Sequence, residues 1–207
     1  MLLQDHDIIV FQGDSITDAG RDRTDSESLG HGYPLLLASA LGRLYPEKKL
    51  TFYNRGIGGD RATDLQSRWE EDALALKPTV LSLYIGINDT WRRYDEGEET
   101  TAEAFERSYR DLLDRTLAAG DVRLILLEPF VLQVPGLDRE WRSDLDPKIA
   151  VVRKLAREYG ARLVPLDGLF NAAALADPAY WAADGVHPTP AGHALIAEAW
   201  MKAAGIR

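Results

Sequence analysis

Short apolar runs alternate with stretches of helical period along this chain of 207 residues. Each run is rich in β-branched residues or leucine and is too short for a helix, which is typical of a buried strand. Strands that alternate with helices predict a parallel sheet covered on both faces, because parallel neighbours need crossover connections. The pattern predicts an α/β/α sandwich with a five-stranded parallel sheet, its strands at residues 8–11, 51–53, 80–85, 124–127 and 163–164.

The composition fits one domain over residues 1–207. Hydrophobic residues make up 45% of the chain, enough for a sizeable core, and no repeat or linker interrupts it. The formal net charge of −9 argues against a nucleic-acid-binding surface, which would be basic. The chain has no cysteine, which excludes disulfides, thiolate metal sites and cysteine nucleophiles.

The first apolar run leads directly into Gly13-Asp14-Ser15. Glycine lets the backbone turn sharply, and in open α/β sheets ligands bind outside the carboxyl ends of the strands. Ser15 is therefore a candidate nucleophile, with Asp14 supporting it through hydrogen bonds to the backbone of the turn. The same three residues are also ordinary turn chemistry, so alone they do not identify an enzyme.

A second polar motif lies near the far end of the chain, where Asp184 and His187 stand three positions apart. A serine hydroxyl needs a base to take its proton, and that base needs another group to fix its tautomer. We expect Asp184 to hold Nδ1 of His187, which leaves Nε2 for Ser15. The alternative is a loop histidine that caps a neighbouring segment.

Two turns rich in glycine and asparagine follow the second and third predicted strands. Acyl transfer develops negative charge on the carbonyl oxygen, and preorganised N–H donors stabilise that charge. Gly59, within residues 54–60, offers a backbone N–H, and Asn88, within residues 86–89, offers its side-chain amide. Each turn also suits a plain connection in a doubly wound sheet.

Together these motifs resemble the four sequence blocks of the SGNH hydrolases, also called GDSL esterases, and they follow that family's order over residues 13–188. The resemblance implies a flavodoxin-like α/β/α fold and serine-esterase chemistry. It also implies an oxyanion hole formed by the N–H groups of Ser15 and Gly59 and the side-chain amide of Asn88.

Within that family, residues 68–72 and 86–95 are most similar to bacterial carbohydrate acetylesterases of the acetylxylan-esterase type. Some of these relatives carry a tryptophan directly before the catalytic aspartate, where this chain has Ala183 and its nearest tryptophan is Trp181. Indole faces stack well against sugars, so we expect Trp91 and Trp181 to bind substrate. The alternative is that each packs within its own domain.

The chain is thus predicted to be a serine esterase that removes O-acetyl groups from carbohydrates, such as acetylated xylo-oligosaccharides, through an acyl-enzyme intermediate. A lysophospholipase or thioesterase would need an apolar channel, whereas the two long segments near the site, 17–31 and 128–146, are polar. A non-catalytic carbohydrate-binding or scaffold protein should have lost a member of the constellation. We expect no cofactor, no metal, no nucleic acid and no membrane partner.

The start of the chain has neither the basic nor the apolar segment of a signal peptide, and no run approaches the ~18 apolar residues of a spanning helix. We therefore expect a cytoplasmic protein, unless a leader was removed before the numbering begins.

Local expectations concern the irregular segments. Residues 17–31 and 128–146 are predicted to wall the substrate site, and residues 92–101 to form an exposed loop. Asp146 is predicted to cap the helix that follows the second of these segments. The resemblance to acetylesterases, which often form homo-oligomers, implies that exposed loop aromatics, Trp141 among them, are buried between subunits.

Overall fold

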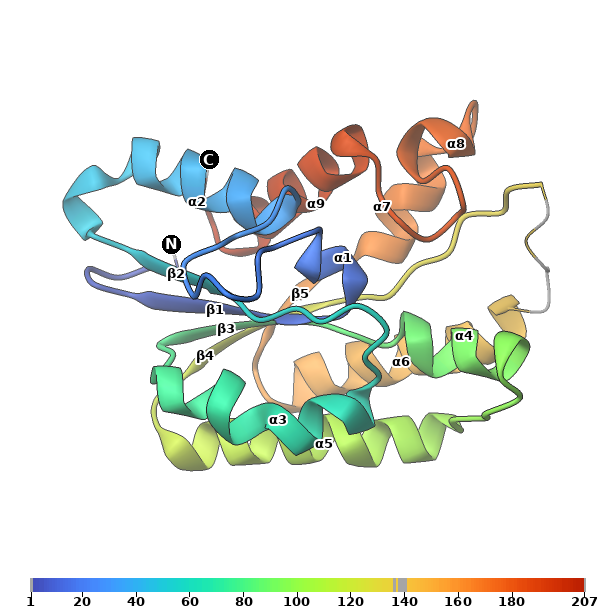
Figure 1. Ribbon diagram of the computed structural model, residues 1–207, viewed down its shortest axis with the longest axis horizontal. Helices are drawn as coiled ribbons and strands as arrows, with labels where there is room; N and C mark the ends of the chain where they lie inside the picture. Colours follow the sequence, from blue (N-terminus) through green and yellow to red (C-terminus); the bar gives the residue numbers. More distant parts are fainter. Residues whose placement is uncertain (1, 136, 138–140, 207) are drawn as a thin grey trace.

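A computed structural model describes residues 2–135, 137 and 141–206 and contains a central parallel sheet of order β2-β1-β3-β4-β5 (Figure 1). This confirms the fold class that the alternation of strands and helices predicts. The strands are β1 (Ile8–Gly13), β2 (Thr51–Asn54), β3 (Val80–Tyr84), β4 (Arg123–Leu127) and β5 (Arg162–Val164).

Helices cover both faces of the sheet (Figure 1). One face carries α2 (Tyr33–Leu44), α7 (Leu166–Ala173), α8 (Pro178–Trp181) and α9 (Pro190–Ala203). The other carries α3 (Ala62–Asp72), α4 (Ile87–Asp95), α5 (Ala102–Ala119) and α6 (Trp141–Glu158). Shorter turns are α1 (Ser15–Asp18), η1 (Pro46–Lys48) and η2 (Leu74–Leu76). None of the helices in the described parts of the chain combines the length and apolar character that crossing a lipid bilayer requires.

Two apolar clusters fill the space between the sheet and its helices. Successive residues of a strand point to opposite faces, so the apolar run of β1 supplies both clusters. Ile9 and Phe11 pack with Trp200 of α9, and Val10 packs with Trp69 of α3. Both tryptophans are fully buried, as their positions on apolar helical stripes predict.

The position of β1 decides where a ligand approaches the sheet. β1 pairs with β2 on one side and with β3 on the other, so the direction of winding changes between β1 and β3. In open α/β sheets such a switch point opens a crevice at the carboxyl ends of the strands. The segments that leave β1, β2 and β3 therefore meet at one edge of the sheet.

The prediction of an exposed loop over residues 92–101 is wrong in its first part, because α4 extends into it. The buried face of α4 carries polar side chains: Asp89 and Thr90 are both fully buried. Such a face has no apolar period to mark it as a helix. Its hydrogen-bond partners come from other elements, as when the backbone N–H of Ala62 donates to Oδ2 of Asp89 at 3.1 Å.

The prediction of an irregular segment over residues 128–146 is also wrong at its end, because α6 begins at Trp141 and contains Pro147 in its interior. Proline lacks the backbone N–H that a helix interior uses, whereas the first turn of a helix does not need it. In the sequence, Pro147 therefore resembles a residue at the start of a helix. Trp141 is only 4% exposed and packs against aromatic rings of α4, which holds the turn ahead of the proline. It is not an exposed aromatic and gives no support to a subunit interface. Residues 136 and 138–140 of this segment lie outside the described residues.

A buried histidine joins α9 to the start of α2. His193 is 9% exposed, and its Nδ1 accepts a hydrogen bond from the backbone N–H of Tyr33 at 3.2 Å. Burial, with a smaller contribution from His187, lowers the pKa of His193 to about 4. His193 is therefore neutral at physiological pH and serves as a hydrogen-bond acceptor inside the fold.

We expect His193 to make the protein less stable as the pH falls from about 6.5 to about 4. In this window the unfolded chain binds a proton at His193 that the folded protein does not, so stability is lost by up to about 1.4 kcal/mol per pH unit. His193→Gln keeps a polar side chain but cannot titrate, and it should flatten this part of the curve. Urea unfolding at a series of pH values measures both proteins; equal slopes would contradict the assignment.

Candidate active site

Ser15 is the first residue of α1, and only Asp14 separates it from the end of β1. The chain needs glycine at Gly13, because a Cβ there would clash with the backbone carbonyl oxygen of Tyr84. Asp14 caps the short helix: its Oδ1 accepts a hydrogen bond from the backbone N–H of Ile16 at 3.0 Å. These contacts hold the Ser15 hydroxyl at the carboxyl end of the sheet.

Asp14 precedes Ser15 in the turn and is 1% exposed. Burial raises the pKa of Asp14 to about 7, the hydrogen bond from Ile16 opposes this rise, and the carboxylates of Asp89 and Asp60 add to it. The contact with the backbone of the turn that the sequence suggests for Asp14 is present in the structure.

His187 faces Ser15 from the loop that precedes α9. Its Nε2 lies 2.9 Å from Oγ of Ser15, and its Nδ1 lies 2.6 Å from Oδ2 of Asp184. The other carboxylate oxygen of Asp184 accepts hydrogen bonds from the backbone N–H groups of His187 and Val186. Partial burial favours the neutral acid, but these hydrogen bonds prevail and lower the pKa of Asp184. The three side chains form a continuous chain of contacts across 172 residues of sequence.

The loop that carries His187 is fixed on two sides. Ala182 and Pro188 form an antiparallel bridge that closes its base. Gly185 has a φ of 84°, which favours glycine, and its carbonyl accepts a hydrogen bond from the backbone N–H of Leu132 at 2.8 Å. The loop is therefore tied to the segment that follows β4.

Gly59 and Asn88 lie next to Ser15 at the same edge of the sheet. Gly59 has a φ of 90°. The Nδ2 of Asn88 donates a hydrogen bond to the carbonyl oxygen of Asp60 at 3.0 Å, which orients the amide beside the Gly59 loop. Because a primary amide carries two N–H donors, this bond leaves the second one for a ligand.

Arg68 of α3 connects the elements that carry these groups, and its side chain is 15% exposed. Its guanidinium donates to the carbonyl oxygen of Gly13 at 3.3 Å and to that of Arg55 at 2.8 Å. It also pairs with the carboxylate of Asp60 at 2.7 Å. The end of β1 and both ends of the loop that carries Gly59 are thus held by one side chain.

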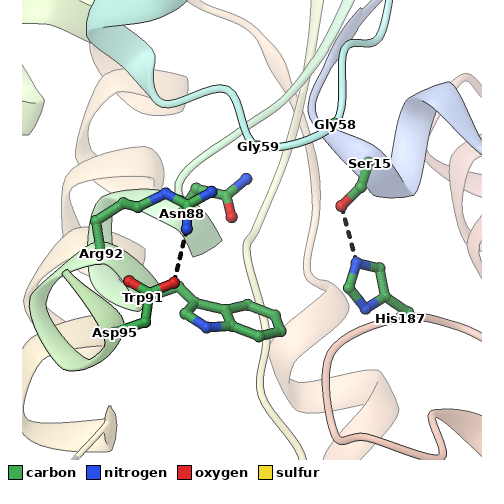
Figure 2. A pocket seen from close by; sticks show the side chains of 8 residues that line it. All are labelled: Ser15, Gly58, Gly59, Asn88, Trp91, Arg92, Asp95 and His187. Atoms are coloured by element: carbon green, nitrogen blue, oxygen red, sulfur yellow. Dashed lines mark hydrogen bonds and ion pairs between the residues drawn. The ribbon is translucent and has the colours of Figure 1, made fainter.

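These groups open into one pocket of about 390 Å³ (Figure 2). Of the described residues in 17–31 and 128–146, none lines it, so the two polar segments predicted as substrate walls do not form the wall that the structure describes. Among the described residues, no group of three or more histidines, aspartates or glutamates is placed to hold a metal ion. The lining consists of Ser15, Gly58, Gly59, Asn88, Trp91, Arg92, Asp95 and His187.

One face of α4 supplies the wall of the pocket. Asn88, Trp91, Arg92 and Asp95 are spaced i, i+3, i+4 and i+7, which is the spacing of one helix face. The indole of Trp91 lies 5.8 Å from the ring of His187, measured between centroids. Sequence reasoning placed Arg92 on an exposed loop and gave Asp95 no role. The spacing itself is the signal that identifies them once α4 is recognised as a helix.

Trp181 does not line this pocket. Its indole packs edge-on against Tyr180, with centroids 5.3 Å apart, and lines a separate hollow beside Glu198 of α9. Of the two tryptophans expected to bind substrate, the structure brings only Trp91 to Ser15.

Comparison with known proteins agrees with this arrangement. The profile of the GDSL-like lipase/acylhydrolase family matches residues 11–195. An acetylxylan esterase from Geobacillus stearothermophilus is 36% identical over 208 residues, which cover 95% of this chain and 93% of that protein. The chain belongs to the GDSL-like lipase/acylhydrolase family and is a carboxylic ester hydrolase.

Solved structures show the same architecture. Axe2, an acetylxylan esterase from Geobacillus stearothermophilus, has a TM-score of 0.91 at 35% identity, covering 100% of this chain and 98% of the other. LAE5, an alpha/beta hydrolase enzyme from the metagenome of Lake Arreo in Spain, has a TM-score of 0.91 at 34% identity, covering 99% of this chain and 98% of the other.

Proposed function

We propose that this protein is a serine esterase that removes O-acetyl groups from small acetylated carbohydrates such as xylo-oligosaccharides. The observation that carries the proposal is the chain of contacts from Ser15 through His187 to Asp184, which faces a pocket with a polar and charged wall. The likeness to an acetylxylan esterase over nearly the full length of both chains supports the substrate class.

In the first half of the reaction, Oγ of Ser15 attacks the acetyl carbonyl carbon while Nε2 of His187 takes the hydroxyl proton. Asp184 holds the other ring nitrogen and stabilises the imidazolium that forms. When the tetrahedral intermediate collapses, the bond between the carbonyl carbon and the sugar oxygen breaks, and His187 gives its proton to that oxygen. The sugar leaves with a free hydroxyl, and the acetyl group stays on Ser15.

In the second half, His187 takes a proton from a water molecule, and the resulting hydroxide attacks the acetyl carbonyl. The bond to Ser15 Oγ then breaks, the serine recovers its proton from His187, and acetate leaves. In both halves the negative oxygen rests among the N–H groups of Ser15 and Gly59 and the side-chain amide of Asn88. The position of all three residues in one pocket supports this oxyanion hole.

The two alternative functions have less support. A lysophospholipase or thioesterase binds long acyl chains in an apolar channel, whereas this pocket contains the charged side chains of Arg92 and Asp95. A non-catalytic carbohydrate-binding protein has no need for a serine and a histidine at 2.9 Å with a carboxylate behind them.

The first prediction from the proposed function concerns the nucleophile and its base. Ser15→Ala and His187→Ala should each lower kcat/KM for p-nitrophenyl acetate by at least roughly 10³-fold, and the double variant should be little worse than either. The reason is that the histidine acts only through the serine. Steady-state kinetics measure all three variants, and additive losses in the double variant would refute the assignment.

The second prediction concerns the oxyanion hole. Asn88→Ala should lower kcat by roughly 10²–10³-fold and change KM little, because the lost hydrogen bond forms mainly in the transition state. Asn171→Ala is the matched control: its amide bonds to Asp167, and it lies outside the pocket. A change confined to KM would mean that Asn88 binds the ground-state substrate instead.

The third prediction concerns acyl length. An apolar channel would gain about fourfold in affinity for each buried methylene, whereas a short polar pocket rejects each one. We expect kcat/KM to fall from acetyl to butyryl p-nitrophenyl esters and to be negligible for octanoyl, and we expect acetylated xylo-oligosaccharides to be hydrolysed. A rise through octanoyl would overturn the carbohydrate assignment without touching the roles of Ser15 and His187.

A further inference from the structure

The pocket has two chemically different ends. Figure 2 shows Ser15 and His187 at one end and Arg92 with Asp95 at the other, while the glycine loop lies between them. Arg92 also lies close to the glycine loop: its Nη2 is 3.2 Å from the position that a Cβ on Gly59 would take. The guanidinium is therefore adjacent to the proposed oxyanion hole, on the side away from His187.

This arrangement fixes the direction of a bound ester, if the proposed function holds. The carbonyl oxygen lies against Gly59 and Asn88, and the alcohol oxygen must lie beside His187, which protonates it. The acyl substituent then extends away from His187. In this pocket that direction leads toward Arg92 and Asp95.

The guanidinium of Arg92 is held in place by acids of its own helix. It pairs with Asp95 at 2.6 Å and with Glu96 at 3.1 Å, which stand three and four positions further along α4. Its side chain is 24% exposed, and it follows Trp91, whose indole contacts the rings of both Trp141 and His187. Arg92 is therefore a positioned part of the wall.

A charged wall of this kind discriminates by acyl length. An acetyl group carries only one methyl group beyond its carbonyl carbon, so it brings the least apolar volume toward the ion pair. A longer chain must either displace the guanidinium from Asp95 and Glu96 or bury methylenes against charged groups, which removes water from those charges without replacing its hydrogen bonds. The favourable burial of each methylene is thereby cancelled.

We propose that Arg92 is the specificity-determining residue for acyl length, with its guanidinium, held by Asp95 and Glu96, closing the acyl end of the pocket. Sugar binding is left to the side of His187 and Trp91, where the alcohol departs. The inference rests on the proposed function and adds to it the residue that limits the acyl group.

The test compares p-nitrophenyl acetate, butyrate and hexanoate as substrates of Arg92→Ala. The ratio of kcat/KM for the butyryl ester to that for the acetyl ester should rise several-fold over wild type, toward a ceiling of about sixteenfold, since each of the two added methylenes gains up to about fourfold when it is buried away from charge. Arg92→Lys retains a cation of similar reach beside Asp95 and should keep a ratio near that of wild type. Asp95→Ala removes one of the acids that hold the guanidinium and should raise the ratio by a smaller factor.

Arg110→Ala is the matched control. Arg110 lies on α5, pairs with Glu106 at 2.8 Å and Glu158 at 2.7 Å, and does not line the pocket. The ratio of kcat/KM for the butyryl ester to that for the acetyl ester should be the same in Arg110→Ala as in wild type. A wild-type ratio in Arg92→Ala, or an equal rise in Arg110→Ala, would overturn the role of Arg92.

These outcomes differ from a failure of the proposed function. If Ser15→Ala retained activity, the proposed nucleophile would be wrong, and if the wild-type enzyme preferred octanoyl esters, the carbohydrate assignment would be wrong. Either result would appear before any Arg92 variant was measured. If wild type prefers acetyl and Arg92→Ala shows the same profile, the proposed function stands and only the acyl-length role of Arg92 falls.

Discussion

The hydrogen bonds of the Arg68 guanidinium are the constraint on which the geometry of the site depends. A guanidinium presents its donors in a fixed plane, so the groups that it binds cannot shift independently. Here they are the carbonyl at the end of β1, just before Ser15, and the two ends of the loop that carries Gly59. Asp60 also fixes the orientation of Asn88, because its backbone carbonyl accepts the hydrogen bond from the Asn88 amide. Ser15, Gly59 and Asn88 are thereby held in fixed positions relative to one another.

Helix α4 has a polar face that is buried in the protein and a second face that lines the pocket. Asp89 is fully buried and accepts from the backbone of α3, and burial raises its pKa to about 7. Lys148 of α6 is 1% exposed, pairs with Asp144 and reaches Thr90. The hydrogen bond from Lys148 to Thr90 ties α4 to α6, and the one from Ala62 to Asp89 ties it to α3. The opposite face of the same helix then presents Arg92 and its neighbours to the pocket at set positions.

The sequence reveals the sheet and the convergence of the motifs, because the carboxyl ends of parallel strands must meet at one edge. It does not reveal the wall, because the buried face of α4 is polar and carries no apolar period. Trp91 follows Asn88 by three residues, and Trp181 precedes Asp184 by three. The helical path of α4 turns Trp91 into the pocket, whereas Trp181 lies outside it. Sequence distance from the motif residues does not distinguish the two tryptophans. The sequence places Trp141 in an irregular segment because Pro147 resembles the start of a helix. The burial of Trp141 against α4 becomes visible only in the folded protein.

Covalent labelling tests the central role of Ser15 most directly. A fluorophosphonate mimics the acyl group, reacts with an activated serine and remains attached, so peptide mass spectrometry can locate it. The account predicts one label per chain, on the peptide that contains Ser15, with inactivation in proportion to labelling and no label in Ser15→Ala. A stoichiometric label on another residue, or full esterase activity in a protein labelled at Ser15, would contradict it.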